Sequence, residues 1–239
     1  MEKKYPTTLE NGIPSFKNLL VGKKAIEIGG PTPRFVPLGI YTAPSITDNV
    51  NYSQSTLWNK QKDRQAYAFA GKTNPGTTYI CEGTNLGFIA NEEYDVVFNS
   101  HVMEHMVNPL KGIFEWKRIL KKGGIIICVL PWKQNTFDHR RPITSFDRIL
   151  QFYKDDRPEG YVMDLLPEIL ETYDFSRDLP AGNIEQFTER CRHNDKNRAL
   201  HVHVFDFPLI VECLEYASFR VLHTRLVSPF DQIVVALKE

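Results

Sequence analysis

The sequence has no excess of either charge, because 29 Lys and Arg residues balance 29 Asp and Glu residues. Proteins that bind nucleic acid or an anionic membrane usually carry a basic excess, so we expect neither partner. The longest apolar runs, such as residues 125–130, are far too short to span a membrane. The charged start MEKKYPTTLE also lacks the apolar core of a secretory signal. These absences predict a cytoplasmic protein.

Paired cysteines are also absent. The four cysteines are scattered with no CxxC spacing, at Cys81, Cys128, Cys191 and Cys213. This pattern favours buried thiols in a reducing compartment over a disulfide framework or a zinc site. What remains is an ordinary globular composition, with 42% hydrophobic and 12% aromatic residues in a chain of 239. A chain of this length can form one α/β domain with a single core.

Five short apolar runs, each followed by turn residues, have the length of strands that are buried on both faces. They are residues 24–28, 45–52, 77–81, 94–98 and 125–130. Between the last two, residues 108–121 have helical apolar spacing, with Asn108 as N-cap and Gly123 as the stop. A strand, a helix and a strand in this order form a crossover unit, which implies parallel strands.

The end of the chain predicts one more helix and two closing strands. Residues 206–217 have helical spacing, and residues 219–226 and 232–237 form apolar runs joined at Ser228-Pro229. So short a turn permits only antiparallel pairing. We therefore predict an α/β, Rossmann-like doubly wound sheet that is mostly parallel and ends in an antiparallel strand.

Residues 131–205 interrupt this rhythm, with two short helices expected near 145–153 and 163–173. A connection of this length inside a compact domain is usually functional. We predict one domain over residues 1–239, with a core at 21–130 and 206–239 and a helical insertion on the acceptor side at 131–205.

The first predicted strand runs into glycines in AIEIGGPTPRF, residues 25–35. Ligands bind at the carboxyl ends of such strands, where glycine lets backbone N–H groups approach them closely. Pro31 and Pro33 depart from the dinucleotide fingerprint and remove N–H donors, which disfavours a nicotinamide or nucleoside triphosphate site.

Three further strand ends carry polar residues in an order that suits one elongated cofactor. Asp48 is expected to follow the second strand at a spacing that suits a carboxylate binding ribose hydroxyls. Glu82-Gly83 offers an acceptor and a backbone donor to an adenine edge, and Asn99-Ser100-His101 is expected to face an amino-acid portion. The coincidence of four such strand ends predicts a cofactor pocket.

These residues resemble the class I S-adenosylmethionine-dependent methyltransferases, in particular the type 11 superfamily. The similarity is closest in EIGG (27–30), CEGTNLGFI (81–89) and YDVVFNSHVMEHMVNPLKGIFEWKRILKKGGIIICVLP (94–131). The resemblance implies a seven-stranded sheet with an antiparallel last strand, S-adenosylmethionine as cofactor and S-adenosylhomocysteine as product. The cofactor-binding residues that we expect are Glu27, Gly29, Gly30, Asp48, Glu82, Gly83, Asn99, Ser100 and His101. His105, in MEHM, is interpreted as a structural histidine behind the pocket.

The acceptor side has two candidate clusters. Asp138, His139, Arg140 and Arg141 follow the fifth strand, and His201 and His203 alternate in LHVHVFD (200–206). A hydroxyl acceptor would need a base, for which histidine is suited, whereas an anionic acceptor would need cations such as arginine. The candidate catalytic residues are His139, Arg140, Arg141, His201 and His203. We predict no metal site from Asp138 and these histidines, because their spacing is not compact.

DHRRPITSFDRIL together with the later HVHVFD loosely resembles methyltransferases of bacterial surface-polysaccharide gene sets, including those that decorate capsules with methyl phosphoramidate. This resemblance implies a phosphate-like or sugar-linked, anionic acceptor. Arg140 and Arg141 would then clamp the anion, and His139, His201 or His203 would act as base or orienting group.

Three alternative functions predict different properties. A non-catalytic module would bind the cofactor without turnover, and a nicotinamide-dependent oxidoreductase would need the phosphate turn that Pro31 and Pro33 disfavour. Nucleic-acid methylation is disfavoured by the balanced charge, and the fourth strand is followed by NSHV instead of the sequence typical of base methylation.

Overall fold

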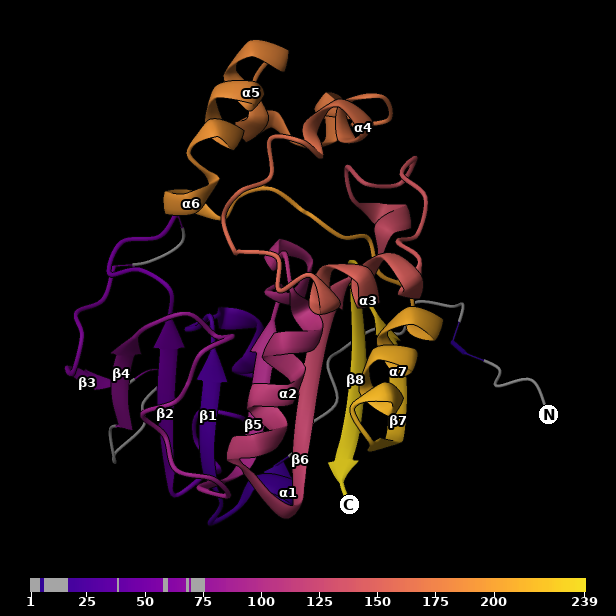
Figure 1. The fold of residues 1–239 in the computed structure, drawn as a ribbon. Coiled ribbons are helices and arrows are strands. Elements are labelled where there is room, and N and C mark those ends of the chain that lie inside the picture. Colours follow the sequence, from indigo (N-terminus) through magenta and orange to yellow (C-terminus); the bar gives the residue numbers. More distant parts are fainter. Residues whose placement is uncertain (1–4, 7–16, 38, 58–59, 68, 70–75) are drawn as a thin grey trace.

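The computed structural model describes residues 5–6, 17–37, 39–57, 60–67, 69 and 76–239 (Figure 1). One sheet runs through the molecule in the order β3-β4-β2-β1-β5-β6-β8-β7. The strands are β1 (Lys24–Ile28), β2 (Ile46–Asn51), β3 (Ala66–Tyr67), β4 (Gly76–Ile80), β5 (Tyr94–Ser100), β6 (Leu120–Pro131), β7 (Phe219–Val227) and β8 (Asp231–Lys238).

The pairing of these strands confirms the predicted sheet. β4, β2, β1, β5 and β6 are parallel neighbours, and the last strand, β8, lies antiparallel between β6 and β7. The structure adds an eighth strand to the seven expected, the two-residue β3, which pairs antiparallel with β4 at the edge. A strand of two residues has no periodicity from which it could be predicted.

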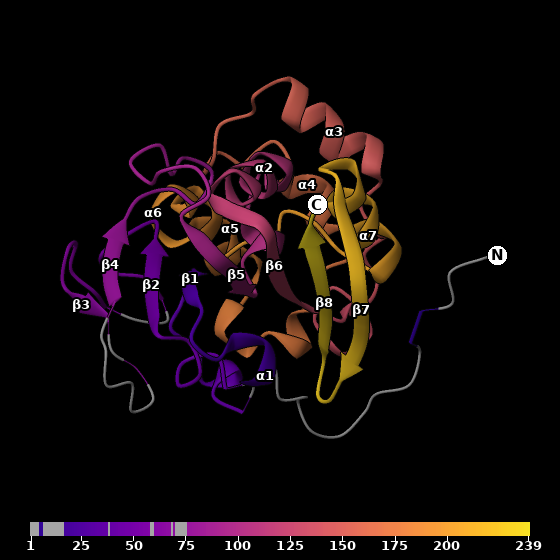
Figure 2. The same ribbon diagram turned by 90° about the horizontal axis from the view of Figure 1, so that it is seen from below.

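Helices α2 (Pro109–Ile119), α3 (Phe146–Lys154) and α7 (Phe207–Tyr216) cover one face of the sheet, and α1 (Lys17–Leu20) lies on the other (Figure 2). Trp116 of α2 and Leu214 of α7 are fully buried in the core on the first face. Phe35 and Phe98 pack edge to face in the core on the second, with ring centroids 5.1 Å apart. Among the described residues no helix has the length and apolarity needed to cross a membrane.

Helix α2 begins as predicted but ends earlier. The Asn108 side chain accepts a hydrogen bond of 3.2 Å from the Lys111 N–H, as expected of an N-cap. The helix stops at Ile119 and β6 starts at Leu120, so the prediction that Gly123 ends the helix was wrong. Gly123 lies inside β6 with φ 74°, a backbone conformation that glycine adopts without steric cost.

The 131–205 segment stands over the carboxyl ends of the strands (Figure 1). Helices α3 and α4 (Leu166–Leu170) lie where two helices were predicted, and α5 (Ile184–Arg192) and α6 (Asn194–Asn197) are additional. The segment has its own apolar cluster, which includes Val162, Ile169 and Phe187. The same cluster contains Val107 of the core, so the segment packs against the molecule beneath it.

Candidate active site

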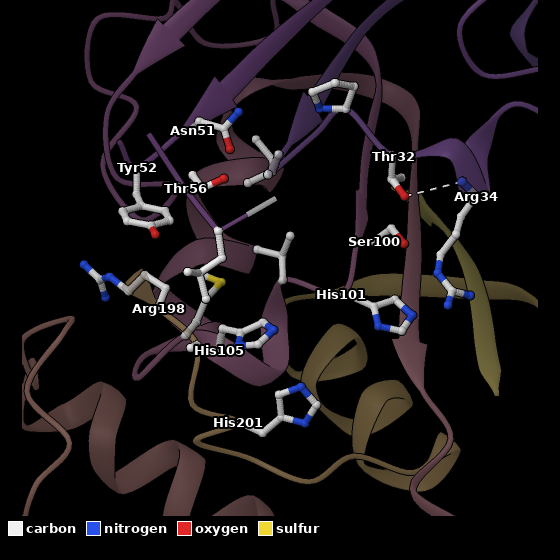
Figure 3. A pocket seen from close by; sticks show the side chains of 18 of the residues that line it. Thr32, Arg34, Asn51, Tyr52, Thr56, Ser100, His101, His105, Arg198 and His201 are labelled. Carbon is white, nitrogen blue, oxygen red and sulfur yellow. Dashed lines mark hydrogen bonds between the residues drawn. The ribbon is translucent and has the colours of Figure 1, made fainter. Parts of the chain in front are cut away.

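A cavity of about 890 Å³ lies between the carboxyl ends of the strands and the 131–205 segment (Figure 3). The strand ends contribute Gly29, Asn51, Tyr52, Glu82, Gly83, Ser100 and His101. The segment contributes Phe137, Glu159, Asp178, Arg190, Arg198 and His201. Ligands of open α/β sheets bind at this edge, and the volume suits a cofactor together with a small acceptor.

The glycine turn after β1 has room only for glycine. Gly29 has φ 86°, and a Cβ added there would lie 2.4 Å from Cγ2 of Val102. A Cβ on Gly30 would lie 1.8 Å from the carboxyl carbon of Glu27, which folds back beneath the turn. Both side-chain-free positions are therefore required for the turn to keep this shape.

Glu27 supports this turn from below and does not line the cavity, although it was predicted as a cofactor contact. Its buried carboxyl group accepts hydrogen bonds from the hydroxyls of Tyr41, at 2.8 Å, and Tyr67. Burial raises the pKa of Glu27 to about 8, against the smaller lowering effect of the two tyrosine hydrogen bonds. The acid is therefore largely neutral at pH 7.

Asp48 is likewise not at the cavity, which corrects its expected place at the strand end. It pairs with Ile26 inside the sheet, and its carboxylate accepts 2.6 Å hydrogen bonds from the Tyr94 hydroxyl and the Thr77 N–H. The end of β2 is formed instead by Asn51, followed by Tyr52, and both residues line the cavity. The Asn51 side chain donates to the carbonyl of Gly30 at 2.6 Å, which ties β2 to the glycine turn.

The other strand ends agree more closely with expectation. Glu82, Gly83, Ser100 and His101 line the cavity, whereas Asn99 is buried in the sheet with its amide 3.5 Å from Cys128 Sγ. Glu82 forms an ion pair with Arg198 of the 131–205 segment, so this segment and the strand end are in direct contact.

His101 is held in a left-handed backbone conformation, with φ 54°. Its Nε2 lies 2.9 Å from Oδ1 of Asp231, to which Arg34 also donates at 2.7 Å. A non-glycine residue in this region of φ is uncommon and is often found at functional sites. Asp231 thus fixes two cavity side chains, His101 and Arg34.

A second group of side chains closes the cavity opposite the glycine turn. His105 and His201 line it, with ring centroids 4.6 Å apart in an edge-to-face arrangement (Figure 3). The His201 Nδ1 lies 2.5 Å from Oδ2 of Asp138, and Oδ1 of Asp138 accepts from Arg141 at 2.7 Å. The Arg141–Asp138–His201 chain therefore fixes the ring of His201. Burial opposes protonation of His201, but Asp138 outweighs this effect and raises its pKa.

Glu104 lies behind these rings and is only 1% exposed. Its Oε1 is 3.6 Å from Nδ1 of His101 and 3.9 Å from Nε2 of His105. None of the described residues hydrogen-bonds either carboxyl oxygen. Burial raises the pKa of Glu104 and lowers the pKa of His105 well below its usual range.

Only one of the five predicted catalytic residues, His201, lines the cavity. Arg141 is buried and donates to the carbonyls of His201 and Val202, so it supports the segment instead of facing an anion. Arg140 has a side chain that is 60% exposed and lies 3.5 Å from Asp174. The expected clamp of Arg140 and Arg141 is therefore not at the cavity.

The remaining two histidines also point elsewhere. His139 contacts Asp174, with Nε2 to Oδ2 at 2.7 Å, and the buried His203 has Nε2 3.1 Å from the Val107 carbonyl. The alternation of His201 and His203 predicted that both lie on one face of an extended segment. The connection that carries them belongs to no strand of the sheet, so their side chains point in different directions.

Sequence reasoning missed several cavity residues. His105 was interpreted as structural but lines the cavity, and Glu104 was not singled out, although the two are adjacent in MEHM. Arg34 lines the cavity from near the start of the chain and Arg190 and Arg198 from the 131–205 segment, each paired with a carboxylate. Nothing in their local sequence indicates this convergence.

The comparisons with known proteins agree with this architecture. Residues 46–128 match the family described as "Methyltransferase domain". A 39-residue stretch is 44% identical to ubiquinone biosynthesis O-methyltransferases of Cereibacter sphaeroides and Ruegeria sp.. This stretch is 16% of the chain and 16% of the length of those relatives.

Solved structures of similar fold extend over nearly the whole chain. A S-adenosylmethionine-dependent methyltransferase from Methanosarcina mazei is 15% identical, with a TM-score of 0.53 over 96% of this chain and 99% of its own. One from Mesorhizobium loti is 13% identical, with a TM-score of 0.53 over 91% and 92%. Residues 46–128 therefore match a methyltransferase domain, and the chain has the fold of class I S-adenosylmethionine-dependent methyltransferases.

Proposed function

We propose that the protein methylates a hydroxyl oxygen of a small or sugar-linked acceptor. The observation that carries this proposal is the contrast between the two ends of the cavity. One end is the glycine turn with the ends of β2, β4 and β5, and the other holds His201 fixed by Asp138. A methyl donor at the first end and a hydroxyl at the second would use all of these groups.

The first end fits the cofactor. Gly29 lines the cavity and has no side chain, so a ligand can approach its backbone closely. In this proposal Asn51 and Tyr52 would bind ribose hydroxyls, Glu82 and Gly83 an adenine edge, and Ser100 the amino-acid portion, since all five line the cavity. When bound, S-adenosylmethionine supplies a methyl group on a positively charged sulfur. The residues around it orient the reactants and exclude water.

At the second end, His201 is suited to accept the proton of a hydroxyl. Because Asp138 binds Nδ1 at 2.5 Å, the proton of the neutral ring is held there and Nε2 keeps its lone pair. Arg141 binds the other oxygen of Asp138, so the carboxylate stays in place. A histidine oriented by a carboxylate in this way is a general base of the kind known from hydrolytic triads.

Two observations favour a neutral hydroxyl over a phosphate-like oxygen. Arg140 and Arg141, expected to clamp an anion, do not line the cavity. Arg34, Arg190 and Arg198 do line it, but Asp231, Asp178 and Glu82 already neutralise them. The matched relatives are named O-methyltransferases, which also supports an oxygen acceptor. A phosphoramidate acceptor in capsule biosynthesis stays a prediction of the sequence.

The test has a binding step and a turnover step. Calorimetric titration with S-adenosylhomocysteine and, separately, with NADH should give micromolar binding of the former alone. Isotopically labelled S-adenosylmethionine is then incubated with panels of phenols, sugars, sugar phosphates and phosphoramidates. We expect transfer to a hydroxyl compound, reduced at least a hundredfold in His201→Ala and little changed in His139→Ala. Binding without transfer to any compound would favour a non-catalytic module, and labelling of phosphoramidates alone would reject the hydroxyl acceptor.

A further inference from the structure

Glu104 poses a physical problem that methyl transfer alone does not solve. A buried carboxyl group without hydrogen bonds loses several kcal/mol of solvation free energy, and such groups are rare in folded proteins. Glu104 is 1% exposed, and none of the described residues hydrogen-bonds its two carboxyl oxygens. A buried polar group in this state commonly has a role in catalysis or a bound ion as its partner.

The atoms nearest to Glu104 are those of a metal site. One ligand atom from each of Glu104, His105 and His201 lies within 4.8 Å of the other two. The first two residues belong to the short helix η2 (Met103–His105), and His201 comes from the connection before α7. Val202 and His203 donate their N–H groups to the Glu104 carbonyl at 2.7 and 3.2 Å. These bonds fix the two segments side by side.

We propose that Glu104, His105 and His201 bind one divalent transition-metal ion at the acceptor end of the cavity. Two imidazoles and one carboxylate form a donor set that suits Zn²⁺, Mn²⁺, Fe²⁺ or Co²⁺ and leaves positions open for other ligands.

The surroundings of the two rings fit this assignment. His201 Nδ1 is 2.5 Å from Asp138, and His105 Nδ1 is 3.2 Å from the Leu200 carbonyl. Metal-binding histidines usually donate one ring N–H to a carboxylate or a carbonyl, which leaves the other nitrogen for the ion. Both rings of this pair have such a partner on the same nitrogen, Nδ1, so Nε2 is the coordinating atom in each.

The position of the ion gives it a role that rests on the proposed function. His105 and His201 line the cavity, so the open coordination positions face an acceptor. A hydroxyl bound to the ion has a lowered pKa and loses its proton to water. Its oxygen then forms the O–CH₃ bond as the S–CH₃ bond breaks and sulfur keeps the electron pair. The ion does not change oxidation state. In the metal-bound protein, coordination replaces proton transfer to His201 as the means of activating the hydroxyl.

The test measures metal binding without any acceptor. The untagged full-length protein is treated with a chelator, dialysed, and titrated calorimetrically with Zn²⁺, Mn²⁺, Co²⁺ and Mg²⁺. We expect one transition-metal ion per chain, bound at least a hundredfold more tightly than Mg²⁺. The Co²⁺ form should show visible absorption typical of nitrogen and oxygen ligands.

Variants locate the ion. Glu104→Gln, which keeps the size of the side chain, and His201→Asn should each weaken binding at least tenfold. His139→Ala, which removes a histidine of the same segment outside the cluster, should bind the ion as the wild type does. Circular dichroism checks that each variant is folded.

Two results would overturn the site: no stoichiometric ion and no Co²⁺ absorption in the wild type, or unchanged affinity in folded Glu104→Gln and His201→Asn. The wild-type measurement decides even if a variant does not fold. Binding of S-adenosylhomocysteine, measured separately, keeps the two proposals apart. Cofactor binding and methyl transfer with no metal would leave the proposed function intact, whereas metal binding without methyl transfer would leave the site intact.

Discussion

The cavity has two walls that are built by different forces. The strand-end wall is positioned by backbone hydrogen bonds of β1, β2, β4 and β5, which fix the register of every residue that follows them. The wall formed by the 131–205 segment has no such ladder. Its apolar cluster packs against Val107, and charged side chains fix the residues that face the cavity. Arg141 binds Asp138, Arg190 binds Asp178, and Arg198 reaches down to Glu82.

This difference separates what each wall can do. A sheet edge tolerates few changes of backbone but holds ligand contacts rigidly, because its hydrogen bonds are shared among neighbouring strands. A wall built from ion pairs depends on a few side chains, and loss of one partner leaves a buried charge uncompensated. We therefore expect cofactor binding to be disrupted by substitutions that create a clash with the backbone. We expect the acceptor side to be disrupted by substitutions that remove a charge.

The largest effect should come from the glycine turn of the first wall. Gly29→Ala places a Cβ where Val102 Cγ2 is 2.4 Å away, so the turn must move. We expect binding of S-adenosylhomocysteine, measured by calorimetry, to weaken at least a hundredfold. Gly22→Ala is the matched control, because Gly22 also has positive φ, 73°, but an added Cβ meets nothing within 4 Å. If both variants lose the same affinity for S-adenosylhomocysteine, the positive φ explains the loss and the clash with Val102 does not.

The largest effect on folding stability should come from the buried ion pair of the second wall. Arg141→Met leaves Asp138 without its arginine partner and two buried carbonyls without this donor. Removing one member of a buried pair costs about 3–5 kcal/mol of unfolding free energy, measured by urea denaturation. Arg140→Met, at the exposed neighbouring position, should change it by less than about 0.5 kcal/mol. If Arg141→Met lowers the unfolding free energy no more than Arg140→Met does, the buried ion pair does not stabilise this wall.

Protonation of Glu27 gives the first wall a pH dependence of its own. Folding raises the pKa of Glu27 from 4.5 to about 8, so the folded state binds the proton more tightly than the unfolded state. This contribution is complete below pH 4.5 and is lost as pH rises toward 8. We expect the contribution of Glu27 to the free energy of unfolding to fall by about 2–3 kcal/mol between pH 5 and pH 7. Comparing the unfolding free energies of the wild type and Glu27→Gln over this pH range isolates the contribution of Glu27. If the two free energies change in parallel with pH, Glu27 makes no such contribution.

The smallest effect should come from the contact between the walls. Arg198 pairs with Glu82 and Glu159 and stacks over the ring of Tyr52, 5.4 Å from its centroid. Arg198→Ala should weaken cofactor binding about tenfold, since Glu82 is partly exposed and the pair is screened by water. Arg192→Ala, which removes an exposed arginine paired with Glu189, should have no effect. If Arg198→Ala still binds the cofactor more weakly than Arg192→Ala at high salt, the contact area of the Arg198 side chain explains the loss, and its charge does not.

The two walls also differ in how much of them the sequence predicted. Apolar runs ending in turn residues predicted β1, β2, β4, β5 and β6, because burial on both faces leaves a local pattern. Asp48 shows the limit of this method. It was expected to follow the second strand, but β2 continues to Asn51, because the point where a strand ends is harder to predict than its existence.

The second wall depends on contacts between residues far apart in the chain. Arg141 looked like a ligand for an anion, yet its partner Asp138 and the carbonyls of His201 and Val202 use its donors. The sequence gives residue types but not which charges neutralise each other. Glu104 was not predicted for a related reason, because a carboxyl group that lacks hydrogen-bond partners among the described residues is recognised only from its surroundings.

The position of Asp231 affects the order in which the molecule assembles. It starts β8 and binds both Arg34, 197 positions earlier, and His101, 130 positions earlier. Closing loops of this length costs entropy that only the completed contacts recover, so such pairs form late in folding. β8 must also enter the gap between β6 and β7. The cavity is therefore completed only when the last strand is in place, and a folding intermediate that lacks β8 would have most of its core but no working site.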